Sequence, residues 1–269
     1  MGSLLFRRRP KPFKASWDES LRSSIRQWAW LSNEDQAAVR RFVTHWLAHK
    51  RFEGCGGMKV TEEVVLSIAG QAAIAAIGLE GEFFDRIRSV LVYPGDYKAP
   101  RSTPLDGGSE LLFREHRLGE LSTDGCVVFS WQRVVEGGRM RDGPRSVVVH
   151  ELAHAFDLLD GVVDGIPPLP GTIDARCWRE RFGASYESFL DRFSSTRRQV
   201  QGTTDDMKKR SRRSRMTLLD DYARESEAEY FAVASEAFFQ DPARLARSDD
   251  QLYELLQQAW RQDPIRRVR

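Results

Sequence analysis

Apolar side chains recur at helical spacing in two segments of the N-terminal third of the chain. The first covers residues 31–54, where Ser32 can cap a helix and Asp35 can complete a capping box. The second covers residues 61–78, which are rich in alanine and apolar on most sides. We therefore expect two helices, the second of them in the core.

Short runs of β-branched residues follow. Residues 89–95 and 125–131 are such runs, bounded by glycine or proline, and they predict two strands joined by a polar loop and hairpin. Helical patterns with aromatic or leucine stripes then occupy residues 178–189, 225–240 and 251–260. Together these patterns predict a mainly helical α+β fold with a small mixed sheet.

No internal repeat or clear linker divides the chain. We expect a basic arm and lead-in over residues 1–30 and one compact domain over residues 31–269. Within that domain, residues 197–215 are strongly basic and nearly free of aromatic side chains, which predicts a solvated, flexible loop. The alternative is a surface for an anionic partner or nucleic acid, where interleaved aromatic residues would be expected.

Composition narrows the class of protein. The 269 residues are 41% hydrophobic and 30% charged, with a net charge of +2, so composition gives no case for nucleic-acid binding. The three cysteines are far apart and without CxxC spacing, which argues against disulfides and thiolate metal sites. No apolar run reaches membrane-spanning length, and the N-terminus lacks the pattern of a signal peptide. We expect a cytoplasmic protein without membrane partners.

The stretch SVVVHELAHAFDLLDG carries the candidate chemistry. His150 and His154 are four residues apart, so on a helix both imidazoles face one point. Zinc binds such nitrogens and keeps a position open for water in hydrolytic sites. Glu151 lies about 100° around the helix, where it can reach a metal-bound water as general base. The surrounding apolar residues make an unpaired cluster costly, which favours a metal site over a chance pentapeptide.

The other histidines lack this context. His45 and His49 have the same spacing, but Trp46 replaces the glutamate, and the segment is amphipathic. We interpret both as ordinary surface or boundary residues. His116 stands alone in a polar loop and has the same interpretation.

A third protein ligand must come from elsewhere. Asp157 is too far along the helix from His150 for its short side chain to close the site, which favours a supporting role. Glu229 and Glu236 lie seven residues apart and share an apolar helical face, so one could bind metal and the other support a histidine. Spacing leaves a second possibility open, because Ser226 and Glu229 also fit a capping box.

The segments VVVHELAHAFD and LDDYARESEAEYFAVASEAFF resemble the Mlc titration factor A family of bacterial zinc peptidases. That family is distantly similar to the catalytic domain of anthrax lethal factor. The likeness includes HKRFEGCGGMKVTEE, IAGQAAIAAIGL, VLVYPGDY and GCVVFSWQ, and it covers most of the chain from about Leu31 to Pro264. The basic stretch of residues 197–215 departs from the family, because it looks longer and more charged than the usual connection.

The resemblance assigns roles to individual residues. It implies that His150, His154 and Glu229 bind one zinc ion per chain and that Glu151 is the general base. It also implies that the Tyr222 phenol stabilises the tetrahedral oxyanion, a role suited to a hydroxyl donor beside the metal.

The resemblance also implies a fold and a function. It indicates a zincin-like peptidase, most similar to aminopeptidases, that binds peptides, and the repressor Mlc is an expected partner in the control of sugar uptake. In such folds an edge strand holds the substrate by strand addition, and we expect GCVVFSW to be that strand. The alternative function is a regulatory protein that sequesters the repressor, with weak or no hydrolysis. A less favoured one is a nucleic-acid-associated protease that uses the basic loop.

Overall fold

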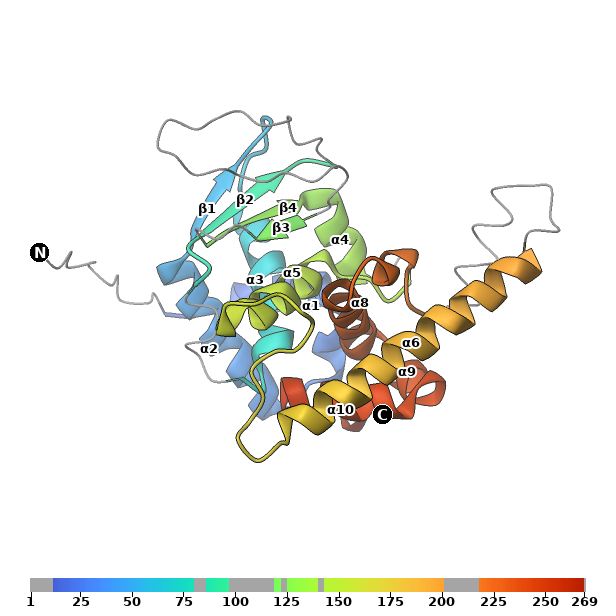
Figure 1. Ribbon diagram of the computed structural model, residues 1–269. Coiled ribbons are helices and arrows are strands. Elements are labelled where there is room, and N and C mark those ends of the chain that lie inside the picture. The colour runs from blue at the N-terminus through green and yellow to red at the C-terminus, as the bar shows by residue number, and fades with distance from the viewer. Residues whose placement is uncertain are drawn as a thin grey trace, which may run out of the picture.

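The computed structural model describes residues 12–79, 86–96, 119–121, 125–139, 143–200 and 218–268, with backbone alone at 119–121 and 195–200. The structure is mainly helical with one small mixed sheet, so the predicted α+β class is confirmed (Figure 1). His116 and nearly all of the basic loop lie outside the described residues. The division of the chain into a lead-in and a single domain stays a prediction.

The sheet has four strands in the order β1-β2-β4-β3. The strands β1, β2 and β4 are parallel, and β3 runs antiparallel to β4. Their bounds are Arg51–Gly54 for β1, Ser89–Tyr93 for β2, Gly119–Leu121 for β3 and Cys126–Ser130 for β4. Both strands that the sequence predicts are thus present as β2 and β4.

The first predicted helix is wrong at its C-terminal end. Helix α2 covers Asn33–His49, and its Ser32 cap accepts a hydrogen bond from the Asp35 backbone as expected. Lys50 then takes an extended conformation, and Arg51 donates to the Arg88 carbonyl across the sheet. Pairing with a strand distant in sequence overrides the helical pattern there.

The prediction that GCVVFSW forms an edge strand is also wrong. Its strand, β4, pairs with β2 on one side and with β3 on the other. Among the described strands the edges are β1 and β3. The prediction failed because the sequence pattern of a strand does not reveal which strands it will pair with.

The lead-in contributes to the core. Helix α1 (Ser16–Ser24) packs beside α3 (Glu62–Ala76), which is buried on nearly all sides as predicted. The 3₁₀ helix η1 (Arg26–Trp30) follows α1, and its buried Gln27 side chain donates to Gln240 of α8. A Cβ atom at Gly70 would lie 2.3 Å from the Ile25 side chain and 2.8 Å from that of Leu21. Glycine therefore permits the close approach of α1 to α3.

The remaining helices build the C-terminal half of the molecule. They are α4 (Trp131–Arg139), α5 (Val147–Asp157), η3 (Leu158–Asp160), α6 (Ala175–Val200), η4 (Asp221–Arg224), α8 (Glu227–Gln240), α9 (Pro242–Ser248), α10 (Asp250–Trp260) and η5 (Pro264–Arg266). Figure 1 shows α5 in the middle of the molecule, beneath the sheet, with α8 beside it. None of the helices in the described residues has the length and apolar character needed to cross a bilayer.

Candidate metal centre

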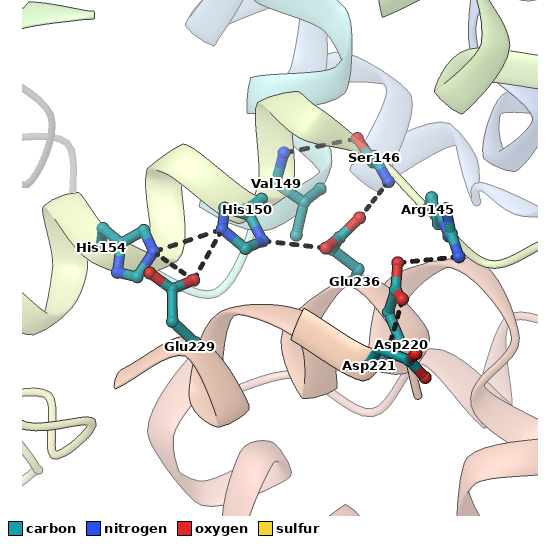
Figure 2. A network of polar contacts seen from close by, with 9 residues as sticks. All are labelled: Arg145, Ser146, Val149, His150, His154, Asp220, Asp221, Glu229 and Glu236. Atoms are coloured by element: carbon teal, nitrogen blue, oxygen red, sulfur yellow. Dashed lines mark hydrogen bonds and ion pairs between the residues drawn. The ribbon is translucent and has the colours of Figure 1, made fainter. Parts of the chain in front are cut away.

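The packed pair α5 and α8 carries the candidate site. Ser146 caps α5, its Oγ accepting a hydrogen bond from Val149 N at 3.3 Å, and the helix projects His150 and His154 from one face. Their ring centroids are 4.9 Å apart. Helix α8 supplies Glu229 opposite these rings, so segments far apart in sequence meet at one point (Figure 2).

Both predictions for Glu229 describe part of the geometry. Its backbone N–H donates to the Ser226 Oγ at 3.2 Å, as a helix cap requires. Its carboxylate, which is buried, lies against the two histidines. The backbone of this residue therefore starts α8 while its side chain is available as a ligand.

Three atoms form a nearly equilateral triangle. The Nε2 atoms of His150 and His154 are 3.3 Å apart, and the Glu229 Oε2 atom lies 3.2 Å from the first and 3.3 Å from the second. Tetrahedral ligands at about 2.0–2.1 Å from zinc would be about 3.3–3.4 Å from one another. The triangle therefore has the size of one face of a zinc coordination tetrahedron, and the three residues fit such an ion.

A second carboxylate orients His150. His150 Nδ1 donates to Glu236 Oε1 at 2.9 Å, so Nε2, which lies in the triangle, is the ring nitrogen that can bind a metal once its proton is lost. The other carboxylate oxygen of Glu236 accepts from Ser146 N at 2.6 Å. Ser146 Oγ in turn donates to Gln71 Oε1 at 3.0 Å, which ties this network to the core helix α3.

The buried charges shift the pKa values of the candidate ligands. Burial opposes protonation of His150, but the carboxylates of Glu229 and Glu236 outweigh it and hold its pKa well above the usual value. Burial likewise disfavours ionised Glu229, but hydrogen bonds from His150 and His154 hold its pKa well below the usual value. The site thus stabilises a negative carboxylate and attracts positive charge, as a cation site requires.

Glu151 and Tyr222 lie beside the triangle. Glu151 is buried, and its negative charge contributes to the raised pKa of His150. Tyr222 lies in η4, with its ring centroid 5.8 Å from that of His150. The structure therefore brings both residues to the candidate centre.

Asp157 lies at the C-terminal end of α5. Its buried Oδ2 atom accepts from Gly165 N at 2.8 Å, and burial raises its pKa to about 6. Gly165 has a φ of +82°, and a Cβ there would lie 2.5 Å from the Glu227 carbonyl oxygen. Asp157 thus holds the loop after α5 against the start of α8, and its charge also interacts with that of His154. Its role in supporting a ligand histidine stays a prediction.

Several polar residues of the site were not predicted from the sequence. Ser146 precedes an apolar run and has the cap-type side chain that marks a helix start. Gln71 is a buried polar residue in an otherwise apolar helix. Arg145 and Asp220 form an ion pair at 2.7 Å that no spacing rule could have found, because they come from different segments.

The remaining described histidines agree with their interpretation as boundary residues. His45 and His49 on α2 are partly buried and stacked, with ring centroids 4.2 Å apart. His49 Nδ1 lies 2.8 Å from the His45 carbonyl oxygen, so the ring makes a local contact within its own helix.

The sequence profile of the family described as glucose-regulated metallo-peptidase M90 matches residues 5–261. The chain belongs to this family. The M90 match covers α5, α8 and η4, and hence all seven residues that the sequence analysis selected. Membership makes the chain a metallopeptidase-family protein, and the triangle on α5 and α8 is compatible with the metal that such a family implies.

Individual relatives span nearly the whole chain. The uncharacterized Synechocystis protein slr2042 is 28% identical over 258 residues, which are 95% of this chain and 86% of the relative. The Mlc titration factor A proteins of Yersinia pestis and Yersinia pseudotuberculosis are each 25% identical over 256 residues, 95% of this chain and 87% of theirs. These matches confirm the family resemblance that the motifs indicated.

Proposed function

We propose that the chain is a zinc-dependent metallopeptidase that acts as an aminopeptidase. His150, His154 and Glu229 would hold one zinc ion per chain, which would polarise the peptide carbonyl and lower the pKa of a bound water. The observation that carries this proposal is the triangle of 3.2–3.3 Å between the three ligand atoms.

The other residues of the site have distinct roles in this proposal. Glu151 accepts the proton of the attacking water and delivers it to the leaving amine. Tyr222 donates its hydroxyl hydrogen to the oxygen that becomes negative in the tetrahedral intermediate. Glu236 keeps the Nδ1 proton on His150, and this fixes the tautomer that can bind metal.

The family relatives support a second role beside catalysis. The Yersinia proteins are named for titrating Mlc, and this chain is similar to them along almost its full length. We therefore propose that a repressor of the Mlc type is a partner in the control of sugar uptake. The alternative is a protein that sequesters such a repressor with little or no hydrolysis, for which a buried Glu151 beside the ligands has no use.

One experiment separates these functions. Purified protein is assayed for zinc by elemental analysis and for hydrolysis of a panel of aminoacyl p-nitroanilides, with Glu151→Gln as the matched variant. We expect about one zinc per chain in both proteins and hydrolysis only in the wild type. Zinc-free protein that takes up no added zinc refutes the metal site, while bound zinc with equal, near-zero hydrolysis in both proteins favours the sequestering role.

Further expectations from the sequence remain proposals. They are a cytoplasmic location, a solvated loop at residues 197–215 and no direct binding of nucleic acid. The loop expectation is tested by deleting residues 199–213, which should leave cleavage of small substrates nearly unchanged. DNA binding that survives moderate salt and is lost in the deletion would contradict it.

A further inference from the structure

An ion pair connects the two segments that meet at the candidate centre. An Arg145 guanidinium nitrogen lies 2.7 Å from Asp220 Oδ2, and both side chains are partly exposed (Figure 2). Arg145 directly precedes Ser146, whose backbone N–H donates to Glu236. Asp220 directly precedes η4 and lies two residues before Tyr222.

The two ends of this ion pair are held by different parts of the molecule. On the Arg145 side, the start of α5 is fixed by the Ser146 cap and by the buried contacts of Glu236 and Gln71. On the Asp220 side, η4 has only four residues; it packs against α8 through the buried Ala223, while Tyr222 is partly exposed. The ion pair therefore joins the short helix η4 to the hydrogen-bonded start of α5, which carries the candidate ligands.

The opposite side of η4 is attached to α6. The Tyr186 hydroxyl donates to the Arg224 carbonyl oxygen at 3.0 Å, and the Arg224 guanidinium lies 4.5 Å from the Phe193 ring centroid. These contacts hold the end of the turn, but they do not connect it to α5. The Arg145–Asp220 pair joins the residue before η4 to the residue before the α5 cap, and it lies two residues along the chain from the Tyr222 ring that contacts His150.

We propose that Arg145 and Asp220 are positioning residues that fix the Tyr222 hydroxyl relative to the metal centre. This inference rests on the proposed oxyanion role of Tyr222. Displacing a reacting group by about 1 Å can lower the rate by up to 10²-fold. An interaction that fixes the position of the Tyr222 hydroxyl can therefore matter for kcat even when it adds little to the stability of the fold. An exposed ion pair contributes little to folding, so its removal should affect catalysis more than stability.

The kinetic test uses Arg145→Gln and Asp220→Asn in otherwise wild-type protein. Asn keeps the Oδ1 atom that accepts from Asp221 N and replaces the Oδ2 atom that meets Arg145. We expect each change to lower kcat about 10-fold, with KM and zinc content unchanged, and the double variant to be no worse than either single variant. The control is Arg181→Gln, which breaks a comparable 2.9 Å ion pair to Glu254 between α6 and α10 and should leave kcat unchanged.

The decisive comparison repeats Arg145→Gln in a Tyr222→Phe background. If the pair acts through the Tyr222 hydroxyl, the change should have no further effect on kcat there. An equal loss of kcat in both backgrounds would overturn the proposal. Wild-type activity in Tyr222→Phe alone would instead refute the oxyanion role, and so would separate failure of the proposed function from failure of this inference.

A second readout does not depend on activity. The six tyrosines are replaced by 3-fluorotyrosine, and the Tyr222 resonance is assigned in ¹⁹F spectra by its loss in Tyr222→Phe. We expect Arg145→Gln to shift or broaden that resonance, because the ring leaves its place beside His150. The Arg181→Gln control should leave it unchanged. A Tyr222 resonance that is identical in wild type, Arg145→Gln and Asp220→Asn would refute the positioning role.

Discussion

Replacing Glu236 by glutamine should weaken metal binding although Glu236 is not itself a candidate ligand. Its carboxylate accepts two hydrogen bonds, from His150 Nδ1 at 2.9 Å and from Ser146 N at 2.6 Å. A glutamine side chain has one oxygen, so it can accept only one of these bonds and must turn an N–H group toward the other donor. Either His150 loses the partner that fixes its tautomer, or the buried start of α5 loses the partner of Ser146.

The hydrogen bonds of the Glu236 carboxylate set the size of the expected change in zinc affinity. A hydrogen bond to a charged group contributes about 1.5–3 kcal/mol, which corresponds to about 10–100-fold in a binding constant. The same range is typical when a carboxylate that supports a ligand histidine is removed. We therefore expect Glu236→Gln to raise the Kd for zinc about 10–100-fold. The volume of the side chain is nearly unchanged, so packing on the apolar face of α8 should remain intact.

The assay is competition for zinc against a chromogenic chelator, followed by thermal unfolding with and without the metal. Glu254→Gln is the matched control, because it makes the same chemical change at an exposed residue of α10. Equal zinc affinity in Glu236→Gln and wild type would refute the idea that the Glu236 contact governs His150. A loss of folding in metal-free buffer would show that the contact with Ser146 dominates instead.

Three further predictions follow from the same geometry. Glu229→Gln should weaken zinc binding, measured by equilibrium dialysis, and an unchanged zinc affinity would show that Glu229 is not a metal ligand. Tyr222→Phe should lower kcat by about 10²–10³ with little change in KM or zinc content, because a hydroxyl that meets the oxyanion acts mainly in the transition state. Burial raises the pKa of Asp157 from 3.8 to about 6, which corresponds to about 3 kcal/mol of destabilisation above pH 6 and none below about pH 4, where folded and unfolded states are both protonated. Asp157→Asn should remove this pH dependence, so urea unfolding should show its stability rising relative to wild type from pH 4 to pH 7, and a constant difference would contradict the reasoning.

Local patterns predicted α2, α3, α6, α8 and α10, because the deciding signals lie within a few residues, but they did not predict α1, α4 or α9. Ser32 and Asp35 form the expected cap, and α3 is buried as its composition predicts. The strand at residues 51–54 was missed because its partner, β2, lies far along the chain. The same limit applies to β4, whose place inside the sheet depends on β3.

The candidate site shows a similar division. The spacing of His150 and His154 places both rings on one helical face, which a helix dictates by itself. The partner of each ring depends on how α5 packs against α8, so spacing left open whether Glu229 or Glu236 meets the metal. The hydrogen bonds through Ser146 and Gln71 could not be predicted, because hydrogen bonds between buried helices produce no periodic pattern in the sequence.

The balance of buried charge favours catalysis over pure sequestration. Glu151, Glu229 and Glu236 are all buried, and all three carboxylates raise the pKa of His150. Removing such charges from water costs several kcal/mol each unless a partner compensates, and a divalent cation is the partner that this donor set fits. A protein that bound a repressor only through its surface would gain stability from apolar residues at these positions, and it would have no use for a buried Glu151. In the proposed metallopeptidase each of these buried carboxylates has a use, because Glu229 would bind the metal, Glu236 would orient His150 and Glu151 would act on the water.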